Sequence, residues 1–263
     1  MPNCWRVVSA SVAGTSHLER NTECQDTHEC LEIPSGDESV LVVIASDGAG
    51  SAEKSLAGAE IACQLFVQEI KTLLTEGGNL EDLTEEFGRE LIAHIQTKIA
   101  AYAEGDNLTS RDYACTLLAA VIGKEAAVFY QIGDGALVYA TGFEANRFCF
   151  GIEPRRSEYV NVTNFVTDHD APQMLQFNII DKQIDDVAIF TDGLQQLAID
   201  FQDMVPHAPF FTPMLAPLRN GNAGAELKQK LSEFLASQAV NKRTDDDKTL
   251  ILASRRRLDS VNN

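Results

Sequence analysis

The spacing of apolar positions changes along the chain between a pattern typical of strands and one typical of helices. Residues 6–13 and 40–46 are short apolar runs rich in β-branched residues, each ended by turn residues, and they predict strands. Over residues 51–75 and 80–103 the apolar positions recur at helical spacing instead, with Gly77 and Gly78 between the two segments. This pattern predicts two antiparallel helices after the first strands.

The period changes again after residue 105. Short apolar runs separated by Gly-Lys-Glu and Gly-Asp-Gly predict a meander of hairpins, and further strands and one helix follow. The predicted hairpin strands are 115–122, 126–132 and 136–141; the later strands are 161–167, 175–180, 187–191 and 249–253; the helix is 225–236. Grouped strands and grouped helices favour an α+β fold of antiparallel sheets covered by helices. No glycine-rich dinucleotide or Walker motif indicates a Rossmann-type sheet.

Composition narrows the class of protein. The chain has 263 residues, is 44% hydrophobic and carries a formal charge of -18, which is typical of a globular protein whose surface repels nucleic acid and anionic lipid. No apolar run approaches the ~20 residues of a membrane span, and the first residues do not resemble a secretion signal. The six cysteines contain no Cys-x-x-Cys pair, so we expect reduced thiols. We therefore expect a single cytoplasmic domain over residues 1–263, with neither nucleic acid nor membrane as a partner.

Three acidic residues lie where predicted strands end or begin. Asp47 follows VLVVIAS, Asp192 follows VAIFT, and Asp246 precedes KTLILA. A single Asp-Gly after a strand is usually only a turn. Several carboxylates that converge on one sheet edge repel one another unless cations lie between them, so the repeated pattern predicts a metal site.

The motifs around these residues resemble the metal-dependent type 2C (PPM) protein phosphatases, particularly their bacterial branch. The resemblance covers nearly the whole chain in order. It is carried by GTSHLERNTECQD ending at Asp26, VIASDGAGS with Asp47 and Gly48, YQIGDGALVY with Asp134, IFTDGLQQ with Asp192, and DDKTLILA with Asp246 and Thr249.

The resemblance implies a four-layer α-β-β-α sandwich that carries two Mn²⁺ or Mg²⁺ ions at one edge. It implies that Asp47 bridges the ions, that Asp26 and the Gly48 carbonyl bind on one side, and that Asp192 and Asp246 bind on the other. Oxygen ligands of this kind suit hard cations. A water shared by the metals would then hydrolyse phosphoserine or phosphothreonine in a protein substrate, with Asp47 and Asp192 as the central catalytic residues. A cognate serine/threonine kinase is the expected counterpart.

The chain departs from the family pattern at several positions. Gln25 replaces an acidic residue, Ala49 replaces a His, and Asn21 stands where many members have a phosphate-binding Arg. Arg20 and His17 are the nearby substitutes for phosphate binding. Asp247 replaces the Asn of the last motif, which either adds a negative charge beside the metals or points to solvent.

Other interpretations stay open at this stage. Asp112, four residues before Thr116, is a candidate ligand for a third metal ion, with a simple turn role as the alternative. The departures also leave open a catalytically weak regulatory or phosphopeptide-binding module on the same fold. The residues His17, Cys24, His28 and Cys30 fit no closed zinc pattern. We expect residues 255–257, all arginines, to form a solvated tail.

Overall fold

Two antiparallel sheets pack face to face in the computed structural model, which describes residues 5–35, 38–142, 146–154 and 163–256. The first sheet has the strand order β2-β3-β4-β5-β8 and the second has the order β1-β12-β9-β6-β7. The strands of the first sheet are β2 (Thr27–Ser35), β3 (Glu38–Ser46), β4 (Leu117–Ile122), β5 (Ala127–Ile132) and β8 (Gln176–Ile180). Those of the second are β1 (Arg6–Val12), β12 (Lys248–Ser254), β9 (Asp186–Phe190), β6 (Ala136–Ala140) and β7 (Cys149–Phe150).

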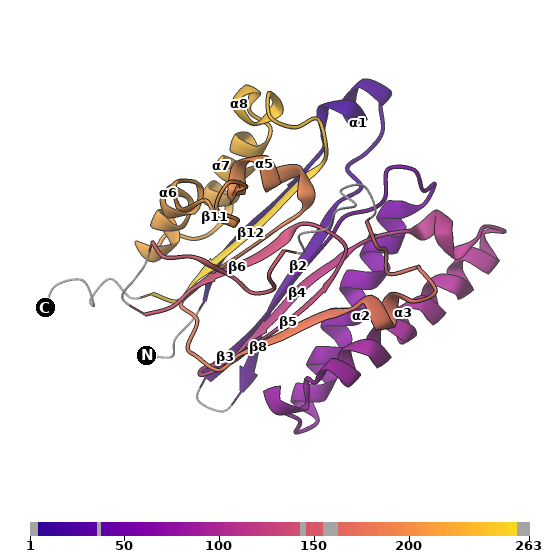
Figure 1. The fold of residues 1–263 in the computed structure, drawn as a ribbon, viewed down its shortest axis with the longest axis horizontal. Coiled ribbons are helices and arrows are strands. Elements are labelled where there is room, and N and C mark those ends of the chain that lie inside the picture. The colour runs from indigo at the N-terminus through magenta and orange to yellow at the C-terminus, as the bar shows by residue number, and fades with distance from the viewer. Residues whose placement is uncertain (1–4, 36–37, 143–145, 155–162, 257–263) are drawn as a thin grey trace, which may run out of the picture.

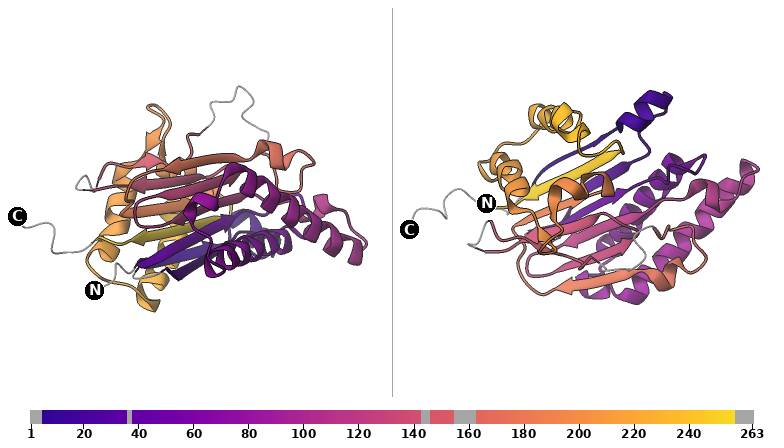
Figure 2. Two further views of the ribbon diagram at one scale, coloured as in Figure 1. Left: turned by 90° about the horizontal axis from the view of Figure 1, so that it is seen from below. Right: turned by 45° about the horizontal axis from the view of Figure 1, so that its top comes forward.

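Helices cover the outer face of each sheet (Figure 1). Helices α2 (Ser55–Thr75) and α3 (Glu85–Gly105) pack on the first sheet, while α6 (Ala208–Arg219) and α7 (Ala225–Leu235) pack on the second. The views in Figure 2 show the same layers from other directions. Short elements complete the description: α1 (Thr15–Arg20), α4 (Ala171–Met174), α5 (Gln195–Ala198), α8 (Gln238–Asn241) and the hairpin of β10 (Ile199–Asp200) and β11 (Val205–Pro206). The predicted α-β-β-α order is confirmed.

Strand periodicity explains why the layers form. Along β3, Val42 and Ile44 face the helices of the first sheet, whereas Leu41 and Val43 pack between the two sheets. Successive side chains point to opposite faces of a strand, and both faces of β3 are buried. This explains why β3 is a continuous apolar run. None of the helices within the described residues has the length and hydropathy of a membrane span.

Three local expectations were wrong. The stretch 163–167 forms irregular chain and a turn rather than a strand, because the Phe165 N–H bonds to the Asp168 carboxylate at 2.7 Å; residues 161 and 162 lie outside the described part. The strands β5 and β6 do not pair as a hairpin, because the Gly-Asp-Gly turn carries the chain from the first sheet to the second.

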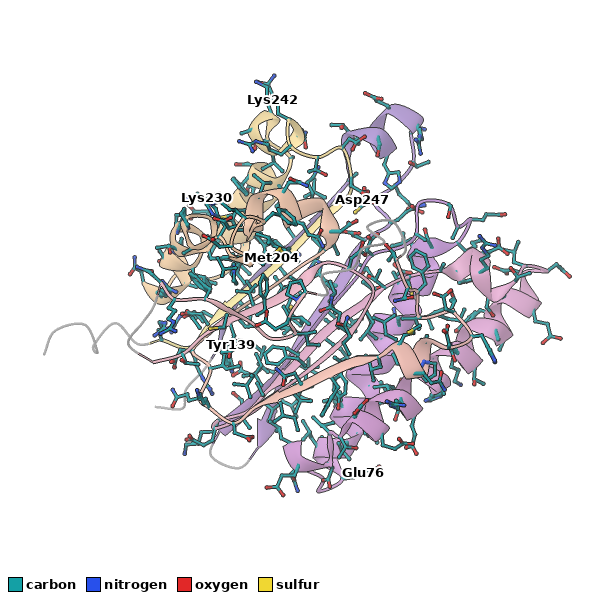
Figure 3. All side chains as sticks on the ribbon, viewed as in Figure 1. Glu76, Tyr139, Met204, Lys230, Lys242 and Asp247 are labelled. Atoms are coloured by element: carbon teal, nitrogen blue, oxygen red, sulfur yellow. The ribbon has the colours of Figure 1, made fainter. Side chains whose placement is uncertain are left out.

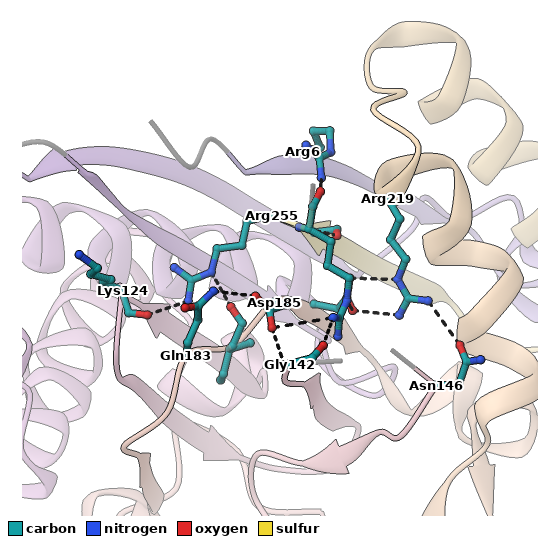
Figure 4. A network of polar contacts seen from close by, with 12 residues as sticks. Arg6, Lys124, Gly142, Asn146, Gln183, Asp185, Arg219 and Arg255 are labelled. Atoms are coloured by element: carbon teal, nitrogen blue, oxygen red, sulfur yellow. Dashed lines mark hydrogen bonds and ion pairs between the residues drawn. The ribbon is translucent and has the colours of Figure 1, made fainter. Parts of the chain in front are cut away.

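The third error concerns the arginines at the end of β12. Arg255 is 5% exposed, stacks over the Trp5 ring at 4.9 Å, and donates hydrogen bonds to the carbonyls of Ile184 and Gly123. Figure 4 shows the polar contacts around Arg255 and Arg219. Arg256 and Arg219 both bind the buried Asp186. Arg255 and Arg256, two of the three residues of the expected tail, are therefore part of the fold, and Arg257 lies outside the described residues.

Candidate metal centre

Strand register brings the acidic residues of the motifs to one edge of the sandwich. In the first sheet Thr27 pairs with Ser46, so the start of β2 lies beside the end of β3. In the second sheet Phe190 pairs with both Ala136 and Leu250, so the end of β9 lies beside the starts of β6 and β12. The residues just beyond these ends are Asp26, Asp47, Asp134, Asp192 and Asp246.

Three of these carboxylates form a tight cluster. Oxygen atoms of Asp47, Asp134 and Asp192 all lie within 4.8 Å of one another, which makes this group able to hold a metal ion. Asp134 was recognised in its motif but was not among the predicted metal ligands. It reaches the cluster because its turn crosses between the sheets, with positive φ angles of 94° at Gly133 and 99° at Gly135 that only glycine adopts readily.

Asp47 is fixed through its backbone. Its N–H donates to the Thr116 hydroxyl at 2.9 Å, and its carbonyl accepts from the Thr116 N–H at 2.8 Å. The next residue must be glycine, because a Cβ at Gly48 would lie 2.7 Å from the Gln25 carbonyl oxygen. The carbonyl of Gly48 as a metal ligand stays a prediction.

Asp26 is 4% exposed and is held from one side only. Thr191 donates its hydroxyl to Asp26 Oδ2 at 2.7 Å, while Oδ1 is buried and has no hydrogen-bond partner among the described residues. The Oε1 atom of the neighbouring Gln25 is in the same condition. Buried oxygens without donors are costly, and a bound cation or its water would satisfy them.

The electrostatics of the edge favour cation binding. Burial raises the pKa of Asp26 to about 7, and the charge of Asp247 adds to the effect. Burial and the charges of Asp134 and Asp246 raise the pKa of Asp192 to about 7. The pKa of Asp47 also lies well above its ordinary value, through burial and then the charges of Asp26, Asp192 and Asp246. A cation bound between these carboxylates would offset both their burial and their mutual repulsion.

The last motif behaves differently at its two acidic positions. Asp246 is exposed, and its Oδ1 accepts the Asp247 N–H at 2.9 Å. Asp247 itself is 2% exposed and is surrounded by donors, so of the two alternatives for this residue the one that points it to solvent is excluded. Its Oδ1 accepts from the Gly14 N–H and from His17 Nδ1, both at 2.7 Å, and its Oδ2 accepts from the Gln25 N–H at 2.5 Å.

The remaining candidates lie around this edge with separate partners. His17 is buried against Asp247, a placement that favours a structural role over phosphate binding. Arg20 is exposed in the last turn of α1, and its role in phosphate binding stays a prediction. The half-buried Asp112 accepts hydrogen bonds from the Thr109 N–H and hydroxyl, which lower its pKa, and its role as a third-metal ligand also stays a prediction.

The two-sheet sandwich with a carboxylate cluster at one edge defines a protein suited to metal-dependent hydrolysis. Comparison with known proteins agrees. Residues 13–236 match the protein phosphatase 2C family. The chain is 38% identical over 259 residues to "Serine/threonine-protein phosphatase 3" of Escherichia coli K12, covering 95% of this chain and 98% of that protein.

Solved structures share the fold at lower identity. The serine/threonine phosphatase of S. agalactiae superposes with a TM-score of 0.62 at 15% identity, covering 95% of this chain and 99% of that one. The phosphatase Stp1 of Staphylococcus aureus gives 0.61 at 12% identity, covering 95% of each chain. The chain belongs to the protein phosphatase 2C family. It is a metal-dependent protein phosphatase of the bacterial type, as its motifs predicted.

Proposed function

We propose that this protein hydrolyses phosphoserine and phosphothreonine in protein substrates, with two Mn²⁺ or Mg²⁺ ions held by Asp26, Asp47, Gly48, Asp192 and Asp246. The observation that carries the proposal is the cluster at the shared sheet edge, in which carboxylate oxygens of Asp47, Asp134 and Asp192 lie within 4.8 Å of one another. The substrate class is supported by the 38% identical relative, which is named a serine/threonine-protein phosphatase.

The donor set fits this cofactor. The candidate ligand atoms at the edge are carboxylate, carbonyl and amide oxygens. Mn²⁺ and Mg²⁺ prefer such oxygen donors to the softer sulfur donors. The Oδ1 atom of Asp26 and the Oε1 atom of Gln25 are buried and have no hydrogen-bond partner among the described residues. A bound cation or its water would supply one. Asp134 belongs to the cluster as well, and we add it to the candidate ligands.

The residues of the chain act mainly by holding ligands in place. Two divalent cations, when bound, activate a water for attack on phosphorus and offset the charge that develops on the phosphoryl oxygens. Thr116 holds the backbone of Asp47, and Thr191 orients the Asp26 carboxylate. Position 49 is an alanine, so its side chain offers no acid for the leaving group. Arg20 is the candidate for binding the substrate phosphate.

The state of the cysteines and the class of enzyme indicate the cellular setting. Cys24, Cys30, Cys63, Cys115 and Cys149 are free thiols, which fits a reducing cytoplasm. A phosphatase of this class acts opposite a serine/threonine kinase, which we propose as its functional counterpart. A catalytically weak regulatory module is not favoured, because the chain belongs to the protein phosphatase 2C family and its 38% identical relative is named a phosphatase.

The test is turnover of phosphoserine, phosphothreonine and phosphotyrosine peptides, with p-nitrophenyl phosphate as a general substrate, in the presence and absence of Mn²⁺. We expect Mn²⁺-dependent release of phosphate from the first two peptides and its loss in Asp192→Asn. Asp82→Asn, which changes an exposed carboxylate bonded to the Asn79 N–H, is the matched control and should retain full activity. Wild-type turnover in both Asp192→Asn and Asp47→Asn would refute the assignment.

A further inference from the structure

The carboxylate of Asp247 joins segments that are distant in the sequence. Its three donors, the N–H groups of Gly14 and Gln25 and the His17 ring, lie 222 to 233 residues away along the chain. Figure 3 shows Asp247 at the start of β12, next to α1. Both oxygens are engaged, and the whole side chain is buried. A carboxylate removed from water is stable only when donors surround it in this way.

Three contacts of Asp247 involve a proposed metal ligand or the residue next to one. Gln25, whose N–H donates to Oδ2, precedes Asp26. Asp247 also follows Asp246 and donates its own N–H to the Asp246 carboxylate. A Cβ at Gly193, the residue after Asp192, would lie 2.0 Å from the Asp247 carbonyl oxygen, so this backbone is in direct contact too.

His17 completes the arrangement with a defined proton. The Oδ1 atom of Asp247 also accepts the Gly14 N–H, so the 2.7 Å contact assigns Nδ1 of His17 as a hydrogen-bearing donor to the same oxygen. All three partners are therefore N–H donors. An Asn at position 247 would present its NH₂ group to at least one of them, which explains why Asp suits this chain where the family motif has Asn.

We propose that Asp247 and His17 are positioning residues that set the separation of Asp26 and Asp246, and through it the affinity for the divalent cations. The inference rests on the metal centre proposed above. Partners that orient metal ligands from outside typically change metal affinity by 10- to 100-fold when they are removed. The affinity for Mn²⁺ should thus depend on a histidine that binds no metal.

The experiment is calorimetric titration of Mn²⁺ into metal-free wild type and variants, with the free energy of unfolding measured in parallel. His17→Leu removes the donor, and we expect Mn²⁺ binding at least about 10-fold weaker. His17→Asn keeps an N–H donor on the same Cγ position and should restore most of the affinity. Asp247→Asn places an amide NH₂ against an N–H and should also weaken binding, which supplies a second test if His17→Leu fails to fold.

Arg219→Met is the matched control for lost stability. It breaks a buried ion pair with Asp186, at 2.9 Å, at the opposite end of β9 from Asp192. We expect it to destabilise the fold and leave Mn²⁺ affinity unchanged. Wild-type affinity in both His17→Leu and Asp247→Asn would overturn the inference, as would equal weakening in Arg219→Met. Absence of Mn²⁺ binding by the wild type would instead overturn the proposed metal centre.

Discussion

Replacement of Asp47 by Asn should make the metal-free protein more stable while removing its activity. The Asp47 carboxylate lies within 4.8 Å of oxygens of Asp134 and Asp192, and no cation offsets their charges in the metal-free state. Asn keeps the size of the side chain and removes one negative charge. The charge of Asp26 also raises the pKa of Asp47, so a neutral amide at position 47 relieves that repulsion as well.

The magnitude follows from the spacing of the charges. Two unit charges 4.8 Å apart repel by about 3 kcal/mol at an effective dielectric constant of about 20. Because the cluster shares protons at neutral pH, only part of this repulsion is present, and we expect a gain of about 2 kcal/mol. For a chain of this size that gain corresponds to a rise in Tm of roughly 4 to 8 °C.

The pH dependence has a definite sign. An acid whose pKa is raised by folding holds its proton more tightly in the folded state than in the unfolded one. The free energy of unfolding of the metal-free protein should therefore fall as pH rises from 3.8, the ordinary value, to about 7, the value for Asp26 and Asp192. At pH 4, near the lower end of that window, the carboxylates of the folded state are protonated, so the repulsion that Asp47→Asn relieves is nearly absent and its advantage should shrink.

The assay is thermal unfolding of chelator-treated wild type and Asp47→Asn at pH 4 and pH 7.5, repeated with millimolar Mn²⁺. Mn²⁺ should raise the Tm of the wild type, since a ligand of the native state stabilises it by mass action, and should raise that of the variant much less. A metal-free variant that melts below the wild type at pH 7.5 would refute the reasoning. So would a gain of the same size at both pH values.

Two further predictions concern residues outside the tight cluster. Asp112→Ala should lower turnover and leave the two tighter Mn²⁺ ions bound in calorimetry. Thr109→Ala, which removes the hydroxyl that bonds to Asp112, is the control. Wild-type turnover in Asp112→Ala would exclude a third-metal role. Arg255→Met should lower the free energy of unfolding in urea by about 2 to 4 kcal/mol, because it leaves buried carbonyls without donors, and should not change Mn²⁺ affinity. A loss of less than about 0.5 kcal/mol in Arg255→Met, which is the size expected for an exposed residue, would contradict that account.

Local periodicity was enough to predict most elements. The β-branched apolar run in residues 40–46 and the helical spacing in 51–75 correspond to β3 and α2, because each signal depends only on residues close together in the sequence. Helix α6 was not predicted, since Pro213 and Pro217 lie inside it and its apolar positions must pack on the second sheet to hold it. The strand β2 was also missed, because its polar residues obscure the alternation.

The sequence by itself placed Asp47 and Asp192 after buried strands, and the motif order indicated the family. That information is local, because a residue directly after a strand must lie at a sheet edge. The tertiary structure alone decided that Asp134 joins the cluster, that Asp247 is buried rather than solvated, and that Arg255 is part of the core. These outcomes depend on donors, acceptors and rings brought from distant segments of the chain, as in the 71-residue separation between Arg255 and Ile184 and the 222-residue separation between Asp247 and Gln25. Such partners leave no periodic trace in the sequence, since they are selected by the packing of two sheets and not by neighbouring residues.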